Sequence, residues 1–174
     1  MKNSIEHIWH FFQLLDKLSY PKHLLQLGIL VSDSSDRTYA RALELADERQ
    51  YKRGKGGRWN KMSVYNANFA NANDQLGDAG LNVGKARHAY EAQIERRRRL
   101  ARSRSWRVTS AIGIEADWAL WIDVDVVEYP VNLIETLLAR AKQESADVVV
   151  PQCAWKTYNE RGCTYLMTKL SFLR

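Results

Sequence analysis

Cysteine and long hydrophobic runs are scarce in this chain of 174 residues. Its two cysteines, Cys153 and Cys163, are too few for a disulfide framework, and their spacing matches neither a zinc site nor a CxxC redox pair. The most apolar N-terminal stretch, residues 5–18, is too short to cross a bilayer and contains charged side chains. Two lone thiols are therefore the default expectation, and pairing in an oxidising compartment is the alternative. The sequence shows neither a signal peptide nor a membrane span.

Positive charge is concentrated in one segment of the chain. The net charge is +6, and residues 85–107 contain nine Lys or Arg against two Glu, which leaves the rest of the chain nearly neutral. This distribution favours a local anion as partner over a nucleic-acid footprint across the surface. Neither an aromatic platform nor zinc-finger spacing accompanies the arginines, so we expect no nucleic-acid partner.

Hydrophobic periodicity and turn residues predict an alternation of helices and strands. Helices are expected over residues 3–18, 36–50, 85–112 and from Pro130, and strands over residues 27–31, 61–66, 118–124 and 146–153. Asn3 is expected to cap the first helix, with Glu6 completing a capping box, and residues 66–84 are expected to form a loop. The alternation predicts an α/β fold with a mostly parallel sheet, helices on both faces, and ligands beyond the carboxyl ends of the strands.

Two aspartates end an otherwise apolar predicted strand. Asp123 and Asp125 are two residues apart, so on a strand they share a face at a separation of ~6.6 Å. With an effective dielectric constant of about 20, two like charges at that distance repel by ~2.5 kcal/mol, and a divalent cation would relieve the repulsion. Oxygen ligands favour Mg²⁺ or Mn²⁺, which share their coordination with water and phosphate. A chance pattern, or an Asp that only caps the next helix, is the alternative.

The segment ERRRRLARSRSWR has two interpretations. Its arginines can form a solvated helix face, or they can bind an anion such as a nucleotide diphosphate. Arg98 and Arg102 are four residues apart, so they lie on one face of the expected helix. An apolar stripe beside that face, which includes Ala101, is expected to pack on the core.

Four segments in chain order resemble the fungal Golgi mannosyltransferases of the Anp–Mnn–Van group, glycosyltransferase family 62: LVSDSSD, RRRRLARSRSW, DWALWIDVDVVEYP and DVVVPQCAW. The resemblance covers residues 3–155 and is most specific in the tryptophan-rich strand with its Asp-Val-Asp. It implies a GT-A fold, which is a Rossmann-like fold that binds a nucleotide sugar. It also implies retaining α-1,6-mannosyl transfer from GDP-mannose to the mannan of N-linked glycans.

The resemblance implies roles for individual residues. Asp123 and Asp125 would hold Mn²⁺ (or Mg²⁺) against the diphosphate of the donor, and Asp123 would also contact the donor. Asp33 would lie near the nucleoside, and Arg98 and Arg102 would lie beside the nucleotide. No residue is assigned as catalytic nucleophile or base.

The resemblance implies more chain than this sequence contains. Family members carry a membrane anchor and a further strand before the position of Asn3, and an acceptor side beyond Tyr158. We therefore expect an incomplete sheet, a partial GT-A domain over residues 1–158 and a divergent tail over residues 159–174. By resemblance, the protein would act on a glycan acceptor in the Golgi lumen, within a membrane-anchored multisubunit mannan polymerase complex. The alternative is a fragment or complex subunit that binds nucleotide sugar or partner chains without turnover.

Overall fold

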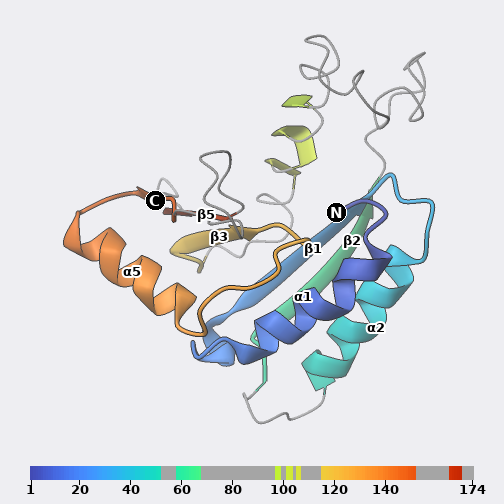
Figure 1. The fold of residues 1–174 in the computed structure, drawn as a ribbon, viewed down its shortest axis with the longest axis horizontal. Helices are drawn as coiled ribbons and strands as arrows, with labels where there is room; N and C mark the ends of the chain where they lie inside the picture. The colour runs from blue at the N-terminus through green and yellow to red at the C-terminus, as the bar shows by residue number, and fades with distance from the viewer. Residues whose placement is uncertain are drawn as a thin grey trace.

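The computed structural model describes residues 1–51, 58–67, 97–98, 101–103, 105–106 and 115–151, and the backbone of residues 165–169. Within them the fold is α/β (Figure 1). The elements are α1 (Ile5–Lys17), the short 3₁₀ helix η1 (Lys22–Leu24), β1 (Gln26–Ser32), α2 (Thr38–Tyr51), β2 (Lys61–Ala67), β3 (Trp118–Ile122), α5 (Leu133–Gln143), β4 (Val148–Val149) and β5 (Tyr165–Lys169). Of the predicted loop 66–84, Asn66 and Ala67 instead belong to β2, and residues 68–84 lie outside the described residues, as do Cys153 and Cys163.

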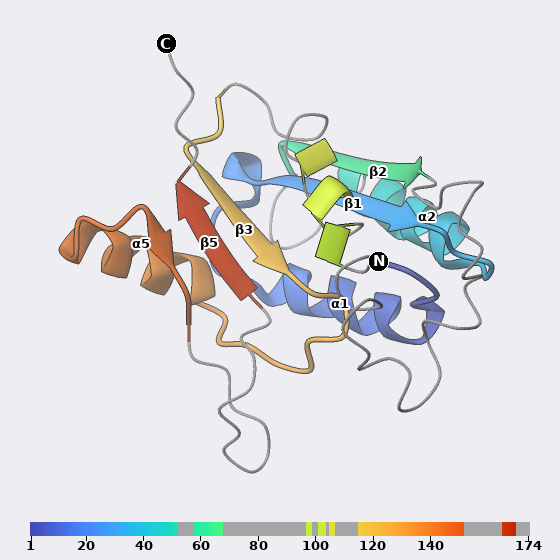
Figure 2. The same ribbon diagram turned by 90° about the horizontal axis from the view of Figure 1, so that it is seen from above.

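The first sheet consists of β1 and β2, which run parallel with Gln26 opposite Lys61 and Ser32 opposite Ala67. Helices α1 and α2 lie next to each other on one side of this sheet (Figures 1 and 2). In β1 the apolar run 29–31 is buried, as is typical of a parallel strand covered by helices. This unit confirms the α/β expectation for the N-terminal half.

The core lies where α1, β1 and α2 meet. Ile8 and Phe12 of α1 and Leu45 of α2 have no exposed surface. The guanidinium of Arg49 lies 4.8 Å from the centroid of the Phe12 ring and pairs with the Asp16 carboxylate at 2.6 Å. The cation–π contact and the ion pair of Arg49 therefore close the edge of the α1–α2 interface.

The second sheet has the strand order β3-β5-β4, and both of its strand pairs are antiparallel. This corrects the prediction of a mostly parallel sheet for the described residues. The reason is that β5 comes from residues 165–169, within the segment that we expected to be a divergent tail, and pairs with β3 along its whole length. Alternation of strands and helices along the sequence does not predict a later strand that pairs antiparallel with earlier ones.

The start of α1 also differs from the prediction. Ser4, not Asn3, is the N-cap and makes no side-chain capping hydrogen bond. Asn3 has a φ of 44°, and its side-chain oxygen accepts a hydrogen bond from the Ser35 N–H at 2.9 Å. The Ser4 N–H in turn donates to the Thr38 hydroxyl at 2.8 Å. Asn3 therefore joins the starts of two helices instead of forming a capping box with Glu6.

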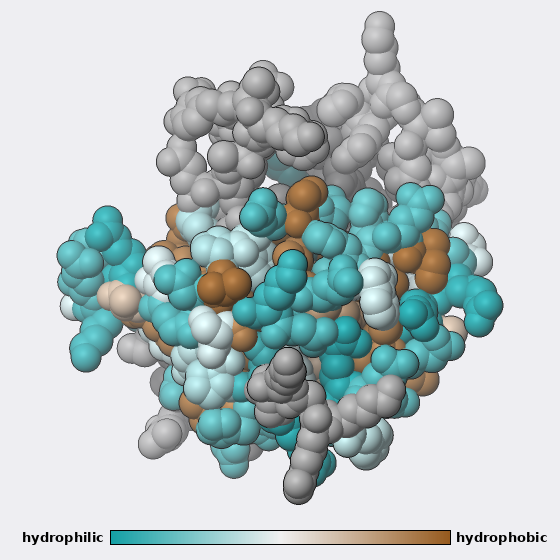
Figure 3. Space-filling model, turned by 60° about the horizontal axis from the view of Figure 1, so that its bottom comes forward, coloured by the Kyte–Doolittle hydropathy of each residue, from teal (hydrophilic) through white to brown (hydrophobic). Residues whose placement is uncertain are grey.

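The face of the molecule shown in Figure 3 is mostly hydrophilic, with hydrophobic residues scattered among polar ones. Such scattered apolar side chains are ordinary on a protein surface. Among the described helices, none has both the length and the apolar composition that a membrane crossing requires.

Candidate functional site

The Asp-Val-Asp motif lies in a turn directly after β3. The strand ends at Ile122, and the Val126 N–H donates to the Asp123 carbonyl at 3.4 Å, which closes the turn. Both carboxylates are exposed, whereas Val126 is buried. The expected shared face along an extended strand is therefore wrong, because the backbone bends as soon as it leaves the core. The two aspartates instead lie in a turn that is anchored by the buried side chain of Val126.

The two carboxylates fit a hard divalent cation that keeps part of its hydration shell. Within the described part of the chain, no group of three or more His, Cys, Asp or Glu is arranged to hold a metal ion. Mg²⁺ and Mn²⁺ commonly bind through one or two carboxylates, with water and substrate phosphates completing the shell. The donor set of Asp123 and Asp125 therefore suits a cation that arrives with, or is completed by, a phosphate ligand.

Asp33 directly follows the carboxyl end of β1. It is half-buried and has a φ of 52°, in the left-handed region that Asp and Asn tolerate better than most residues. Strands β1 and β3 run in the same general direction (Figures 1 and 2). Asp33 and the Asp-Val-Asp turn thus follow the carboxyl ends of two strands that point to the same side of the molecule.

The loop after Asp33 holds the starts of both N-terminal helices. The Asp36 carboxylate accepts hydrogen bonds from the Thr38 N–H at 3.0 Å and the Ile5 N–H at 3.4 Å. Burial acts to raise the pKa of Asp36, but the hydrogen bonds from Thr38 and Ile5 outweigh it and lower the pKa below 3.8. Asp36 therefore stays ionised and joins α1 and α2 at the carboxyl end of β1.

The described part of the arginine segment is helical, as predicted, and Arg98 and Arg102 are exposed on it. Ala101 is exposed as well, so the prediction that it packs on the core is wrong. One contact between this segment and the sheet is made by Trp106, whose ring meets Tyr65 of β2 edge-on at 5.2 Å between centroids. In Figure 1 the yellow-green turns lie above the sheets, with α1 and α2 below. We did not predict this contact from the sequence, although a single tryptophan at the end of an arginine run could have indicated it.

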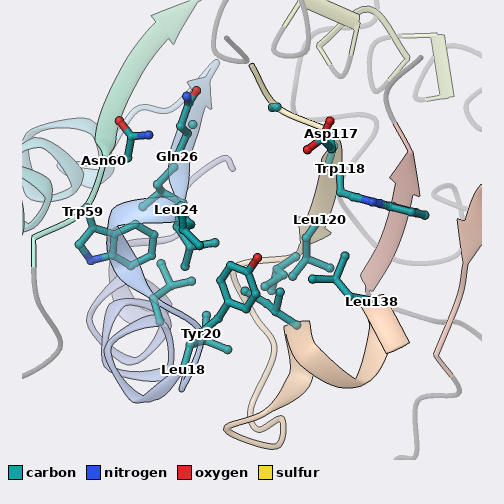
Figure 4. A pocket seen from close by; sticks show the side chains of 18 of the residues that line it. Leu18, Tyr20, Leu24, Gln26, Trp59, Asn60, Asp117, Trp118, Leu120 and Leu138 are labelled. Carbon is teal, nitrogen blue, oxygen red and sulfur yellow. The ribbon is translucent and has the colours of Figure 1, made fainter. Parts of the chain in front are cut away.

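A cavity of about 540 Å³ lies between β1 and β3. Figure 4 shows Trp59 and Asn60 on one wall and Trp118, Leu120 and Leu138 on the opposite one. None of the described residues that line it is Lys or Arg, so these residues do not supply the cations that a nucleotide diphosphate requires.

Two acids line the same cavity, Glu115 and Asp117. They precede β3, whereas Asp123 follows it, and the rise of a five-residue strand is ~17 Å. Glu115 and Asp117 therefore lie at the opposite end of β3 from the Asp-Val-Asp turn.

The sequence of the chain matches one protein family and several of its characterised members. A family model described as Anp1 matches residues 1–167. The chain is 32% identical over 159 residues to the mannan polymerase II complex ANP1 subunit of Saccharomyces cerevisiae, covering 90% of this chain and 29% of that protein. It is 30% identical over 154 residues to the mannan polymerase II complex anp1 subunit of Schizosaccharomyces pombe (87% and 33%), and 30% identical over 149 residues to the mannan polymerase complex subunit mnn9 of the same yeast (84% and 40%). The chain thus spans about a third of the length of these relatives.

Proposed function

Since the chain belongs to the Anp1 family, we propose that it serves mannan synthesis as a mannosyltransferase subunit that uses GDP-mannose as donor. The observation that carries the proposal is the Asp-Val-Asp turn, in which two exposed carboxylates follow β3 on a buried base. The three relatives compared above are subunits of mannan polymerase complexes, which supports the substrate class.

The proposed reaction moves a mannosyl group to a hydroxyl of a mannan acceptor. The bond between the anomeric carbon and the diphosphate oxygen breaks, the bond between that carbon and the acceptor oxygen forms, and GDP and a proton are released. We propose an α-1,6 linkage formed with retention. A bound Mn²⁺ or Mg²⁺ would neutralise charge on the diphosphate as it leaves.

In this proposal, acidic and basic side chains of the site have different roles in binding the donor. Asp123 and Asp125 would hold the cation, and Asp123 would also orient the donor. Arg98 and Arg102 would bind phosphate oxygens, for which guanidinium groups have the matching geometry, and Asp33 would contact the nucleoside. The site would then carry both signs of charge around one diphosphate.

We also propose a cellular setting for this activity. The protein would act in the Golgi lumen, on the glycan acceptor, together with other subunits of a multisubunit complex. The relatives' names as complex subunits support the partners.

Calorimetry with GDP in the presence and absence of Mn²⁺ tests the donor site. We expect Mn²⁺ to strengthen GDP binding, and we expect Asp125→Asn to remove the metal-dependent part. The matched control is Asp117→Asn, which removes an exposed acid at the other end of β3 and should leave the Mn²⁺ effect unchanged. Equal metal dependence in wild type and Asp125→Asn would contradict the proposed site.

Release of GDP from GDP-mannose in the presence of a mannose acceptor tests the transfer. Metal-dependent GDP binding without release would identify a non-catalytic subunit, and salt-sensitive RNA binding without GDP binding would reject both forms of the proposal.

A further inference from the structure

The loop that carries the Asp-Val-Asp motif runs alongside α1 on its way from β3 to α5 (Figures 1 and 2). Two of its side chains, Val126 and Tyr129, are buried in the core. Between them, Val127 has 71% of its surface exposed. Packing therefore does not hold the loop at Val127, two residues after Asp125.

A hydrogen bond from α1 holds the loop at this point. The Nε2 atom of His10 lies 2.6 Å from the carbonyl oxygen of Val127, across 117 positions of sequence. A carbonyl oxygen only accepts, so Nε2 must carry the proton and act as the donor. A second attachment follows where α1 has ended, because the N–H and hydroxyl of Ser19 both donate to the Val131 carbonyl, at 2.8 and 2.9 Å.

We propose that His10 is a positioning residue for the Asp123–Asp125 turn, an inference that rests on the proposed donor site. The contacts that hold the backbone from Asp123 to Val127 include the end of β3, the buried Val126 side chain and the His10–Val127 hydrogen bond. Asp125 lies between the end of β3 and Val126, two residues before the carbonyl that His10 binds. Removing the donor at His10 frees the carbonyl of Val127 to rotate, and the direction of the Asp125 carboxylate changes with it. Outer partners of metal ligands affect affinity in this way.

Two substitutions of His10 distinguish the effect of losing its hydrogen bond from the effect of losing its imidazole ring. His10→Leu removes the donor, whereas His10→Gln retains an amide nitrogen that can reach the same carbonyl. His7→Leu is the matched control, because His7 is also exposed and stands one turn earlier on α1. In His10→Leu we expect the Mn²⁺ concentration for half-maximal GDP binding to rise by about tenfold, with metal-free GDP binding unchanged. We expect His10→Gln and His7→Leu to match wild type.

Hydrogen exchange of the Val126 amide supplies a readout that needs no ligand, since this N–H closes the turn on Asp123. We expect faster exchange in His10→Leu and wild-type exchange in His10→Gln and His7→Leu. If wild type binds no GDP but Val126 exchange follows this order, the proposed donor site fails and the positioning role stands. If Val126 exchange is the same in all four proteins, or if His7→Leu and His10→Leu change it equally, the positioning role is overturned. An unchanged Mn²⁺ requirement in His10→Leu overturns it as well.

Discussion

Met1 and Val31 pair across the edge of β1 in the pattern of a parallel β-bridge. The Met1 nitrogen donates to the Leu30 carbonyl at 2.6 Å, and the Ser32 N–H donates to the Met1 carbonyl at 3.0 Å. Since β2 occupies the other edge of β1, Met1 covers the carboxyl end of the edge that faces β3. The three residues at the amino end of β1 are only half-buried, whereas Ile29 to Val31 are buried, so the cover along this edge is uneven.

This pairing makes a prediction for hydrogen exchange. In a parallel ladder alternate residues direct their N–H groups to opposite edges. Leu30 and Ser32 point to the Met1 edge, so Gly28 points to the cavity and Ile29 points to β2. We expect the Gly28 amide to exchange at least about tenfold faster than the Ile29 amide, measured by NMR under native conditions. Equal protection of the two amides would mean that the cavity edge of β1 is covered along its whole length.

Asp36 should stabilise the fold through its hydrogen bonds to Thr38 and Ile5. Replacing an N-terminal capping Asp by Ala costs ~1 kcal/mol, so we expect a lower free energy of unfolding for Asp36→Ala at neutral pH. Because the pKa of Asp36 in the folded state lies below 3.8, this stabilisation is present above 3.8 and is lost as pH falls through the folded value. The difference between Asp36→Ala and wild type should therefore shrink in acid.

Urea unfolding near neutral pH and at about pH 2 measures the Asp36 contribution. Asp47→Ala is the control, since Asp47 is exposed on the same helix α2 and should change stability by less than ~0.5 kcal/mol. A constant difference between wild type and Asp36→Ala across this pH range would show that the carboxylate charge does not matter.

Lys22 should also make stability rise with pH, but in the alkaline range. Its side chain is 4% exposed and its ammonium lies 5.7 Å from the centroid of the Trp59 ring. Burial lowers the pKa of Lys22 below 10.5, although the charges of Asp16 and Glu135 act to raise it. The folded protein thus binds this proton less tightly than the unfolded chain does. Protonation of Lys22 therefore lowers stability, and this loss disappears as pH rises through the folded pKa toward 10.5.

We accordingly expect wild type to gain stability relative to Lys22→Met between neutral pH and about pH 10. Thermal unfolding at several pH values measures the difference between the two proteins. Lys61→Met, which removes an exposed lysine of β2, should show no such trend. If wild type instead loses stability relative to Lys22→Met as pH rises, the pKa of Lys22 is not lowered in the folded protein.

The elements that the sequence predicts well are those with local signals. The helical spacing of apolar residues in α1 and α5, and the apolar run of β1 before Ser and Asp, place these elements within a few residues of their observed bounds. The sequence predicts an end of β3 that lies beyond the observed one at Ile122, because Val124 and Val126 continue an apolar alternation. In the structure Val126 reaches the core from a turn, and the sequence cannot separate a buried turn residue from a strand residue.

In the candidate site, too, the sequence predicts residues that have a local signal and misses contacts between distant segments. The sequence identifies Asp123, Asp125 and Asp33 because acids at strand ends are unusual, and the structure places all three just beyond a strand. His10 carries no comparable signal, since its partner Val127 is 117 positions away and contributes only a backbone atom. Antiparallel pairing of β3 with β5 was missed for the same reason, because it joins distant segments without a local pattern.

Trp106 should control the arginine segment through its contact with Tyr65. An edge-on aromatic pair contributes ~1 kcal/mol beyond its buried area, so Trp106→Ala should loosen the helical turns that present Arg98 and Arg102. We expect GDP binding without metal to weaken by about fivefold, which corresponds to that energy, whereas the strengthening by Mn²⁺ should be kept because Asp123 and Asp125 are untouched. Calorimetry with GDP, with and without Mn²⁺, separates the two effects.

Two variants complete the Trp106 experiment. Trp106→Phe keeps a ring against Tyr65 and should retain most of the GDP affinity. Trp9→Ala removes a tryptophan of α1 that is 48% exposed. It should leave GDP binding unchanged, because Trp9 packs against Arg41 of α2 and has no role in the proposed donor site. If Trp106→Ala binds metal-free GDP as tightly as wild type, the arginines do not reach the nucleotide and the solvated-face interpretation of this helix is the correct one.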